Sequence, residues 1–168
     1  NKTFSAKNER EILRKCDNPF IIKIFFAFDT ETKLYMGLEY IPGGNLDFLI
    51  RSGNGNLSIE DIKIYLAETA VALNYLHQKG VVYRDLKSEN ILIGRDGHIK
   101  LDDFGLSKIL DLDSNITHSF CGTPEFMPPE MINRSPYGIE VDWWQFGILT
   151  FDLLYGQKPF RHHNLSKL

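Results

Sequence analysis

Cysteine is scarce in this sequence, which has only Cys16 and Cys121 among its 168 residues. Two cysteines are too few for a disulfide framework, so they fit a reducing compartment. We therefore expect a cytoplasmic protein, with the nucleus as a second location. The cysteines and histidines also lack the spacing that is typical of zinc ligands. These absences exclude a small disulfide-rich scaffold and a zinc module.

Long apolar runs are absent as well. The best candidate, residues 146–155, is too short to cross a bilayer and is interrupted by Asp152, so it predicts a buried helix and not a membrane span. No signal peptide is recognisable. The formal net charge of -3 gives no basic excess, so nucleic acid is not an expected partner. The chain begins with Asn1 and not with Met, so we expect a fragment of a longer protein.

The hydrophobic pattern predicts helices and strands within one domain. Hydrophobic residues make up 43% of the chain and charged residues 24%, as is usual for a soluble globular protein of this length. The expected elements are a short helix over 8–15, a hairpin of strands over 21–28 and 34–40, a short helix over 45–51, a long helix from Ser58 to Gly80, a hairpin of strands over 91–93 and 98–101, a long irregular loop over 111–133, and a buried helix over 141–155 that ends at Gly156.

A polar loop over 84–90, between the short apolar runs 81–83 and 91–93, carries the most distinctive chemistry. Asp85 can accept a proton, Lys87 can neutralise a phosphate, and Asn90 can ligate a hard cation through its amide oxygen. The segment 102–105, Asp-Asp-Phe-Gly, follows and offers more carboxylate. Such a loop could simply cap two strands and contact water. The order and spacing of these groups instead favour a site for phosphoryl transfer.

The chain resembles protein kinases in the spacing of Asp85 and Asn90, followed in order by 103–105, 122–125 and 129–130. The likeness is closest to the AGC group of serine/threonine kinases, and three features carry it. They are Tyr83 where most kinases have histidine, the run Phe-Cys-Gly-Thr-Pro-Glu-Phe over 120–126, and Val-Asp-Trp-Trp over 141–144.

The resemblance implies an α+β protein-kinase-like fold. It would contain a partial N-lobe sheet with an αC-like helix and a mostly helical C-lobe, truncated at both ends. The domain would span 1–168, with the remainder of the N-lobe over 1–37, a hinge over 38–44 and a partial C-lobe over 45–168. The glycine-rich phosphate loop and the ATP-binding lysine of the family are not found before Glu9.

The activity implied by the resemblance is transfer of the ATP γ-phosphoryl group to Ser or Thr hydroxyls of protein substrates, with ATP and Mg²⁺ as cofactors. Asp85 matches the catalytic base, Lys87 the residue that neutralises the transferring phosphate, and Thr123 the residue that bridges them. The alternative is a pseudokinase or truncated kinase fragment that acts as a non-catalytic binding module.

Further residues match other parts of the family's site. The implied roles are ATP binding for Glu39, Ile41, Asn45, Glu89 and Leu92, metal ligation for Asn90 and Asp103, the αC ion pair for Glu9, the activation-loop phosphosite for Ser119, phosphate holding for Arg84 and Lys108, and structural roles for Phe104, Gly105, Glu130 and Asp142. Four of the site residues also have a simple structural interpretation. Glu9 and Lys87 could be surface charges, Leu92 could be a core residue, and Ser119 could be an unmodified loop serine.

The resemblance also implies partners. Glu89 matches an acid that holds an arginine upstream of the target residue, whereas Asn45 stands where close relatives have a second acid. We therefore expect a preference for basic residues upstream of the phosphorylated Ser or Thr that is weaker than in relatives with both acids. We also expect an upstream kinase that phosphorylates Ser119.

Overall fold

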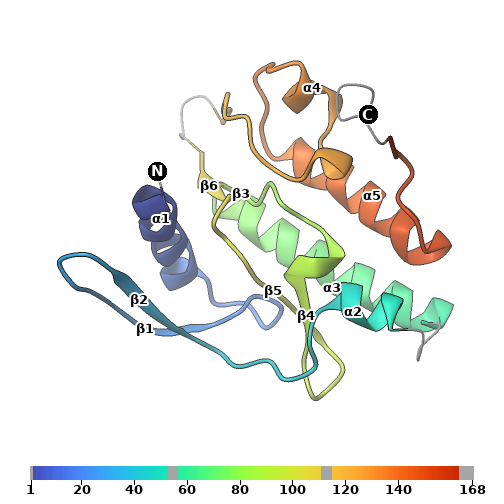
Figure 1. Cartoon of the computed structure of the whole chain (residues 1–168), viewed down its shortest axis with the longest axis horizontal. Helices are drawn as coiled ribbons and strands as arrows, with labels where there is room; N and C mark the ends of the chain where they lie inside the picture. The colour runs from blue at the N-terminus through green and yellow to red at the C-terminus, as the bar shows by residue number, and fades with distance from the viewer. Residues whose placement is uncertain (1, 53–56, 111–114, 163–168) are drawn as a thin grey trace.

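The computed structural model describes residues 2–52, 57–110 and 115–162 (Figure 1). It combines helices with short antiparallel strand pairs, so the α+β class predicted from the sequence is confirmed. The elements in chain order are α1 (Lys2–Lys15), β1 (Ile24–Asp29), β2 (Leu34–Leu38), α2 (Leu46–Arg51), α3 (Ile59–Gln78), β3 (Val81–Val82), the 3-10 helix η1 (Ser88–Asn90), β4 (Ile91–Ile93), β5 (Ile99–Leu101), β6 (Lys108–Ile109), the 3-10 helix η2 (Pro124–Phe126), α4 (Pro129–Ile132) and α5 (Glu140–Tyr155).

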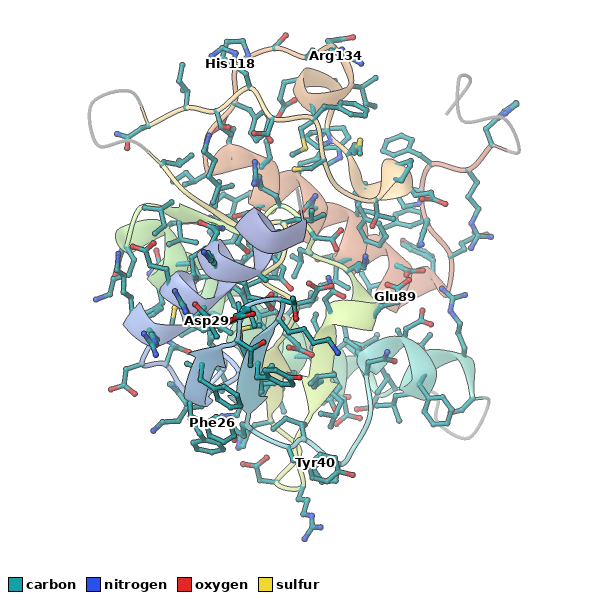
Figure 2. The ribbon with its side chains drawn as sticks, turned by 60° about the vertical axis from the view of Figure 1, so that its left-hand side comes forward. Phe26, Asp29, Tyr40, Glu89, His118 and Arg134 are labelled. Carbon is teal, nitrogen blue, oxygen red and sulfur yellow. The ribbon has the colours of Figure 1, made fainter. Side chains whose placement is uncertain are left out.

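The first part of the chain is helix α1 packed on the hairpin of β1 and β2, as Figure 1 shows. α1 starts six residues before the expected position 8 and buries Ile12 and Leu13. The hairpin lies where the sequence predicts it, but its outer surface is aromatic and open. Phe26 and Phe28 are 59% and 52% exposed, and Phe26 points away from the body of the molecule in Figure 2. The ring of Phe26 lies so close to Gly37 that a Cβ there would come within 2.4 Å of it.

Helix α3 crosses the centre of the molecule and contacts β3, β5 and α5. Its start is fixed by a capping box in which Ser58 and Asp61 bond each other's backbone amides. Its end is followed by Gly80 in the left-handed region at φ 68°, as expected for a helix terminator. The helix buries an apolar stripe against the rest of the core, namely Ile62, Ala72, Leu73 and Leu76.

Two short strand pairs hold the polar loop between them. β4 and β5 form the hairpin that the sequence predicts, and β3 pairs antiparallel with β6, which it does not predict. Strands of two residues are too short to show a period-2 pattern, so the sequence carries no signal for them. The β4–β5 hairpin joins the first part of the chain, because Ile22 N donates to Leu101 O at 2.9 Å.

Helix α5 buries one face and exposes the other. Val141, Ile148 and Leu149 are buried, whereas Trp143 and Tyr155 are 41% and 66% exposed. The prediction of a buried helix therefore holds for one face and is wrong for the outer face, because apolar composition alone does not say which side is covered. Gly156 ends the helix at φ 67°, as expected.

The irregular loop expected over 111–133 is only partly irregular. Residues 111–114 lie outside the described residues, and the remainder contains η2 and α4. The loop prediction is wrong at these two short helices. Both begin with a proline, whose fixed φ is compatible with the first helical position. In the described ranges, no helix has the length and apolar character needed to cross a membrane.

Candidate active site

The polar loop is held in place by a buried carboxylate on α5. Asp142 accepts from the backbone amide of Arg84 at 2.7 Å and from that of Tyr83 at 2.9 Å, and His77 Nε2 lies 2.7 Å from the same carboxylate. Asp142 is fully buried, and a buried charge is tolerated only with such partners. The structure thus places Asp142 at the backbone of the loop, as the resemblance implies.

Gln145 makes a second attachment of the loop to α5, and sequence reasoning missed it. Its Oε1 accepts from Leu86 N and its Nε2 donates to Arg84 O, both at 2.9 Å. Gln145 follows Asp142 by three residues, so both side chains project from the same face of the helix. The available signal was an amide side chain on the face of an apolar helix that already carried an acid. Arg84, between the two attachments, adopts a left-handed backbone at φ 71°.

Asp85 is the centre of the predicted catalytic residues. Its carboxylate accepts from Thr123 Oγ1 at 2.9 Å, from Lys87 Nζ at 2.8 Å and from Asn90 Nδ2 at 3.0 Å. Lys87 Nζ also donates to Thr123 Oγ1 at 3.0 Å. The structure therefore brings Asp85, Lys87, Thr123 and Asn90 together, although Thr123 lies 38 residues beyond Asp85 in the chain. These bonds fix an acceptor carboxylate beside an ammonium group, an arrangement suited to positioning a hydroxyl near a phosphate.

The Asp-Phe-Gly segment lies against both the polar loop and α1. Phe104 is fully buried and meets the ring of Tyr83 edge-on at 5.2 Å between centroids. The hydroxyl of Tyr83 donates to Asp102 O, and burial raises its pKa well above the ordinary tyrosine value, so it stays a donor. Asp103 has a left-handed backbone at φ 52°, and its Oδ1 accepts from Gly105 N at 3.2 Å.

Glu9 faces this segment from α1. Burial raises the pKa of its carboxyl, and the charge of Asp103 raises it further, whereas a hydrogen bond from the backbone of Phe104 lowers it. One turn before it, Ser5 Oγ donates to Gly105 O. The ion pair predicted for Glu9 stays a prediction, because no lysine of this sequence is assigned as its partner. Helix α1 itself lies against the segment that carries Asp102 and Asp103.

Asn90 and Asp103, the predicted metal ligands, are linked through the backbone. Asp102 N donates to Asn90 O at 2.9 Å, so Asp103 is one residue away from that bond. Asn90 uses its Nδ2 to bond Asp85, so its amide oxygen is the atom of this side chain that could ligate a cation. Across the described ranges, no group of three or more His, Cys, Asp and Glu side chains is arranged to hold a metal. One amide and one carboxylate nevertheless fit Mg²⁺, which takes few protein ligands beside substrate phosphates.

The predicted nucleotide-binding residues lie in three places: Glu39, Ile41 and Asn45 in the segment between β2 and α2, Glu89 in η1, and Leu92 on β4. The Glu39 carboxylate is 3.0 Å from Lys100 Nζ, and its backbone N–H donates to Lys23 O at 2.8 Å, so its backbone carbonyl is the group that could bond adenine. Leu92 is half-buried and packs on the core, as the plain-core reading expects, and its contact with the nucleotide stays a prediction. Asn45 Oδ1 caps α2 by accepting from Phe48 N at 2.8 Å. Its amide N–H groups remain available to donate to a ribose hydroxyl.

Ser119 lies in a network that reaches both predicted phosphate-holding cations indirectly. Lys108 Nζ donates to Thr117 Oγ1 at 2.8 Å, and that oxygen is 3.3 Å from Ser119 Oγ. Arg84 reaches Ser119 through Tyr137, since Arg84 Nη1 donates to the Tyr137 hydroxyl, which donates to Ser119 O. Glu130, the remaining structural residue, is half-buried in α4, and its carbonyl accepts from Ser135 N at 2.9 Å.

Three acids gather beside the polar loop, on the side that η1 shares with α2. The buried hydroxyl of Ser88 lies 3.3 Å from Asp47 Oδ1 and 3.4 Å from Glu89 Oε2, and Figure 2 shows Glu89 on this side. Asp152 of α5 completes the group at 3% exposure. Burial raises its pKa, nearby Lys158 and Arg51 lower it, and Asp47 and Glu89 raise it. Among the described residues its Oδ2 has no hydrogen-bond partner. Sequence reasoning noted Asp152 only as an interruption of an apolar run.

Comparisons with known proteins show the family of the chain. The family model of the protein kinase domain matches residues 1–168. The chain is 50% identical over 157 residues to ribosomal protein S6 kinase alpha-2 of Homo sapiens, 50% identical over 156 residues to ribosomal protein S6 kinase alpha-3 of Mus musculus, and 48% identical over 156 residues to ribosomal protein S6 kinase 2 alpha of Gallus gallus. Each match covers 93% of this chain and 21% of the relative, so the chain spans about a fifth of the length of these curated relatives. The chain belongs to the protein kinase family.

Proposed function

We propose that the protein containing this chain is a serine/threonine protein kinase that transfers the γ-phosphoryl group of ATP to protein hydroxyls. The observation that carries the proposal is the Asp85 carboxylate, held at once by Thr123, Lys87 and Asn90. A phosphoryl transfer needs positioning and charge neutralisation more than covalent chemistry, and this cluster offers both. The names of the relatives, all ribosomal protein S6 kinases, support the same activity.

Each residue of the cluster has a distinct task in this proposal. Bound Mg-ATP would supply the phosphoryl group and a neutralising cation, held by Asn90 and Asp103. The Asp85 carboxylate would orient the substrate hydroxyl and accept its proton. Lys87 would neutralise the moving phosphoryl group, and its bond to Thr123 keeps its ammonium group beside Asp85. Lys87 in this loop also favours Ser/Thr over Tyr substrates.

The proposed substrates carry basic residues upstream of the target hydroxyl. The support is the acid group of Asp47, Glu89 and Asp152, whose buried Asp152 Oδ2 lacks a hydrogen-bond partner within the described residues. A buried carboxylate oxygen without a donor is unfavourable, and an arginine guanidinium supplies several donors in a planar fork. Arg51 and Lys158 already lie near these acids, so the preference should be weaker than an unopposed acid cluster would give.

We further propose that phosphorylation of Ser119 by an upstream kinase raises activity. A phosphate there would meet Lys108, which already contacts the neighbouring Thr117 hydroxyl at 2.8 Å. New charge-assisted bonds of this kind order a loop. The segment 104–130, which we call the activation segment, contains Thr123, whose hydroxyl donates to Asp85. Ordering this segment should therefore stabilise the cluster around Asp85.

The test is Asp85→Asn in the natural protein that contains this chain, with the exposed Asp17→Asn as the matched control. Asparagine keeps the shape but cannot take the proton, so turnover should fall by about 100-fold or more. Nucleotide binding should stay nearly unchanged, because the base orients the hydroxyl and not the ATP. Full turnover in Asp85→Asn would refute the assignment. If the wild type and both variants all show no turnover, the result would favour the non-catalytic binding module instead.

A further inference from the structure

Tyr137 connects the activation segment to the polar loop that carries Asp85, which we call the catalytic loop, and no motif points to it. Its backbone forms a two-sided bridge with Thr117, with Thr117 N to Tyr137 O at 2.7 Å and Tyr137 N to Thr117 O at 3.0 Å. Its hydroxyl donates to Ser119 O and accepts from Arg84 Nη1 at 3.3 Å. One residue therefore holds two points of the segment and one cation of the loop.

The ring of Tyr137 is packed against buried residues outside the activation segment, Val82, Met131 and Val141, as well as against residues of that segment. It is 2% exposed and belongs to a separate apolar cluster, whose other buried members are Val82, Leu110, Met127, Met131 and Val141. Burial raises the pKa of Tyr137 to about 12, so the hydroxyl keeps its proton and remains able to donate. A hydroxyl on a fixed ring acts as a rigid anchor, whereas a long flexible side chain at this point would not.

The other end of the connection is equally fixed. The backbone amide of Arg84 bonds the buried Asp142, and its guanidinium also donates to Leu106 O at 2.6 Å. The chain of contacts from α5 through Arg84 and Tyr137 thus reaches Ser119 O without any phosphate. The acceptor is the backbone carbonyl of Ser119, so these contacts do not depend on the serine side chain.

We propose that the Tyr137 hydroxyl is a positioning group that holds the activation segment against the catalytic loop while Ser119 is unmodified. This inference rests on the proposed function of Ser119 as a phosphosite. A phosphate on Ser119 would bring its own anchor at Lys108, so Tyr137 matters most before phosphorylation. The consequence is a measurable basal activity in the unmodified enzyme, supported by a residue that touches neither substrate nor ATP.

The experiment compares Tyr137→Phe in two backgrounds of the natural protein. In the first, Ser119→Ala fixes the unmodified state while keeping the carbonyl that Tyr137 bonds. In the second, Ser119 is fully phosphorylated. We expect Tyr137→Phe to lower kcat about fivefold in the first background, the factor of one ordinary hydrogen bond, with little change in the KM for ATP. In the phosphorylated background the loss should be clearly smaller. The exposed Tyr155→Phe is the control and should change neither.

A second readout does not require activity. Hydrogen exchange of the peptide that covers 115–122 should be faster in Tyr137→Phe and unchanged in Tyr155→Phe. An equal loss of kcat in both backgrounds would reduce Tyr137 to a general structural role and overturn the inference, and so would unchanged exchange. If the wild type shows no turnover at all, the proposed kinase function fails, whereas the exchange measurement still decides whether Tyr137 anchors the segment.

Discussion

Replacing Gln145 with leucine should destabilise the kinase domain far more than its lack of charge suggests. Leucine has a similar size but can neither accept from Leu86 N nor donate to Arg84 O, both of which Gln145 bonds at 2.9 Å. Both backbone groups are buried, and each unsatisfied group costs about 1–3 kcal/mol, so the expected loss is about 2–6 kcal/mol. A domain is stable by only about 5–15 kcal/mol, so this is a large share.

Urea denaturation of the natural protein, followed by a probe of the kinase domain, measures the effect. The exposed Gln78→Leu at the end of α3 is the matched control and should change stability by less than about 0.5 kcal/mol. Gln145→Glu is a sharper comparison, because glutamate keeps the acceptor for Leu86 N but opposes Arg84 O with a second oxygen. It should also destabilise, and turnover should fall in both variants because the loop that carries Asp85 loosens. A Gln145→Leu protein as stable as Gln78→Leu would refute the reasoning.

Three further predictions follow from the same contacts. Ser119→Ala should lower activity and abolish activation by an upstream kinase, and mass spectrometry of active wild-type enzyme should find phosphate on Ser119. Burial raises the pKa of the Asp152 carboxyl in the folded state, so the protein loses stability as the pH rises from the unfolded-state pKa of this group to its folded-state pKa. Asp152→Asn should therefore melt at a higher temperature than wild type at neutral pH. The same variant should lose the preference for basic over neutral peptides. Expressed alone, this chain should associate through its hairpin, and Phe28→Ser should raise the monomer fraction in sedimentation, whereas Phe48→Ser on α2 should not.

The elements that the sequence predicts well are those with local signals. The capping box of Ser58 and Asp61 and the left-handed glycines Gly80 and Gly156 place three helix boundaries within a residue or two. The β1–β2 hairpin follows from two apolar runs that are joined by a polar turn, closed by Thr30 N to Lys33 O. Each of these features depends on residues that are near one another in the chain, so the pattern contains the information.

The contacts between distant segments could not be predicted from pattern alone. Motif spacing brings Asp85, Lys87 and Asn90 close to one another, since they share one loop. The place of Thr123 beside Asp85 came from a family resemblance, and the contacts of Gln145 and Tyr137 came only from the structure. Those two residues bond partners 61 and 18 positions away, respectively, and nothing near them in sequence marks the pairing. Their polar groups are satisfied by the fold and leave no periodic trace.

The buried polar residues of α5 connect stability with the proposed chemistry. Asp142, Gln145 and Asp152 are separated by three and seven residues, which places them on one side of a helix with 3.6 residues per turn. Burying such groups is unfavourable unless each finds a partner. Asp142 and Gln145 find theirs in the backbone of the catalytic loop, which fixes that loop. Asp152 Oδ2 finds none among the described residues, so the same helix that secures the loop leaves one buried acceptor on the side of Glu89. A basic substrate residue would satisfy it, which couples substrate binding to the element that holds the catalytic base.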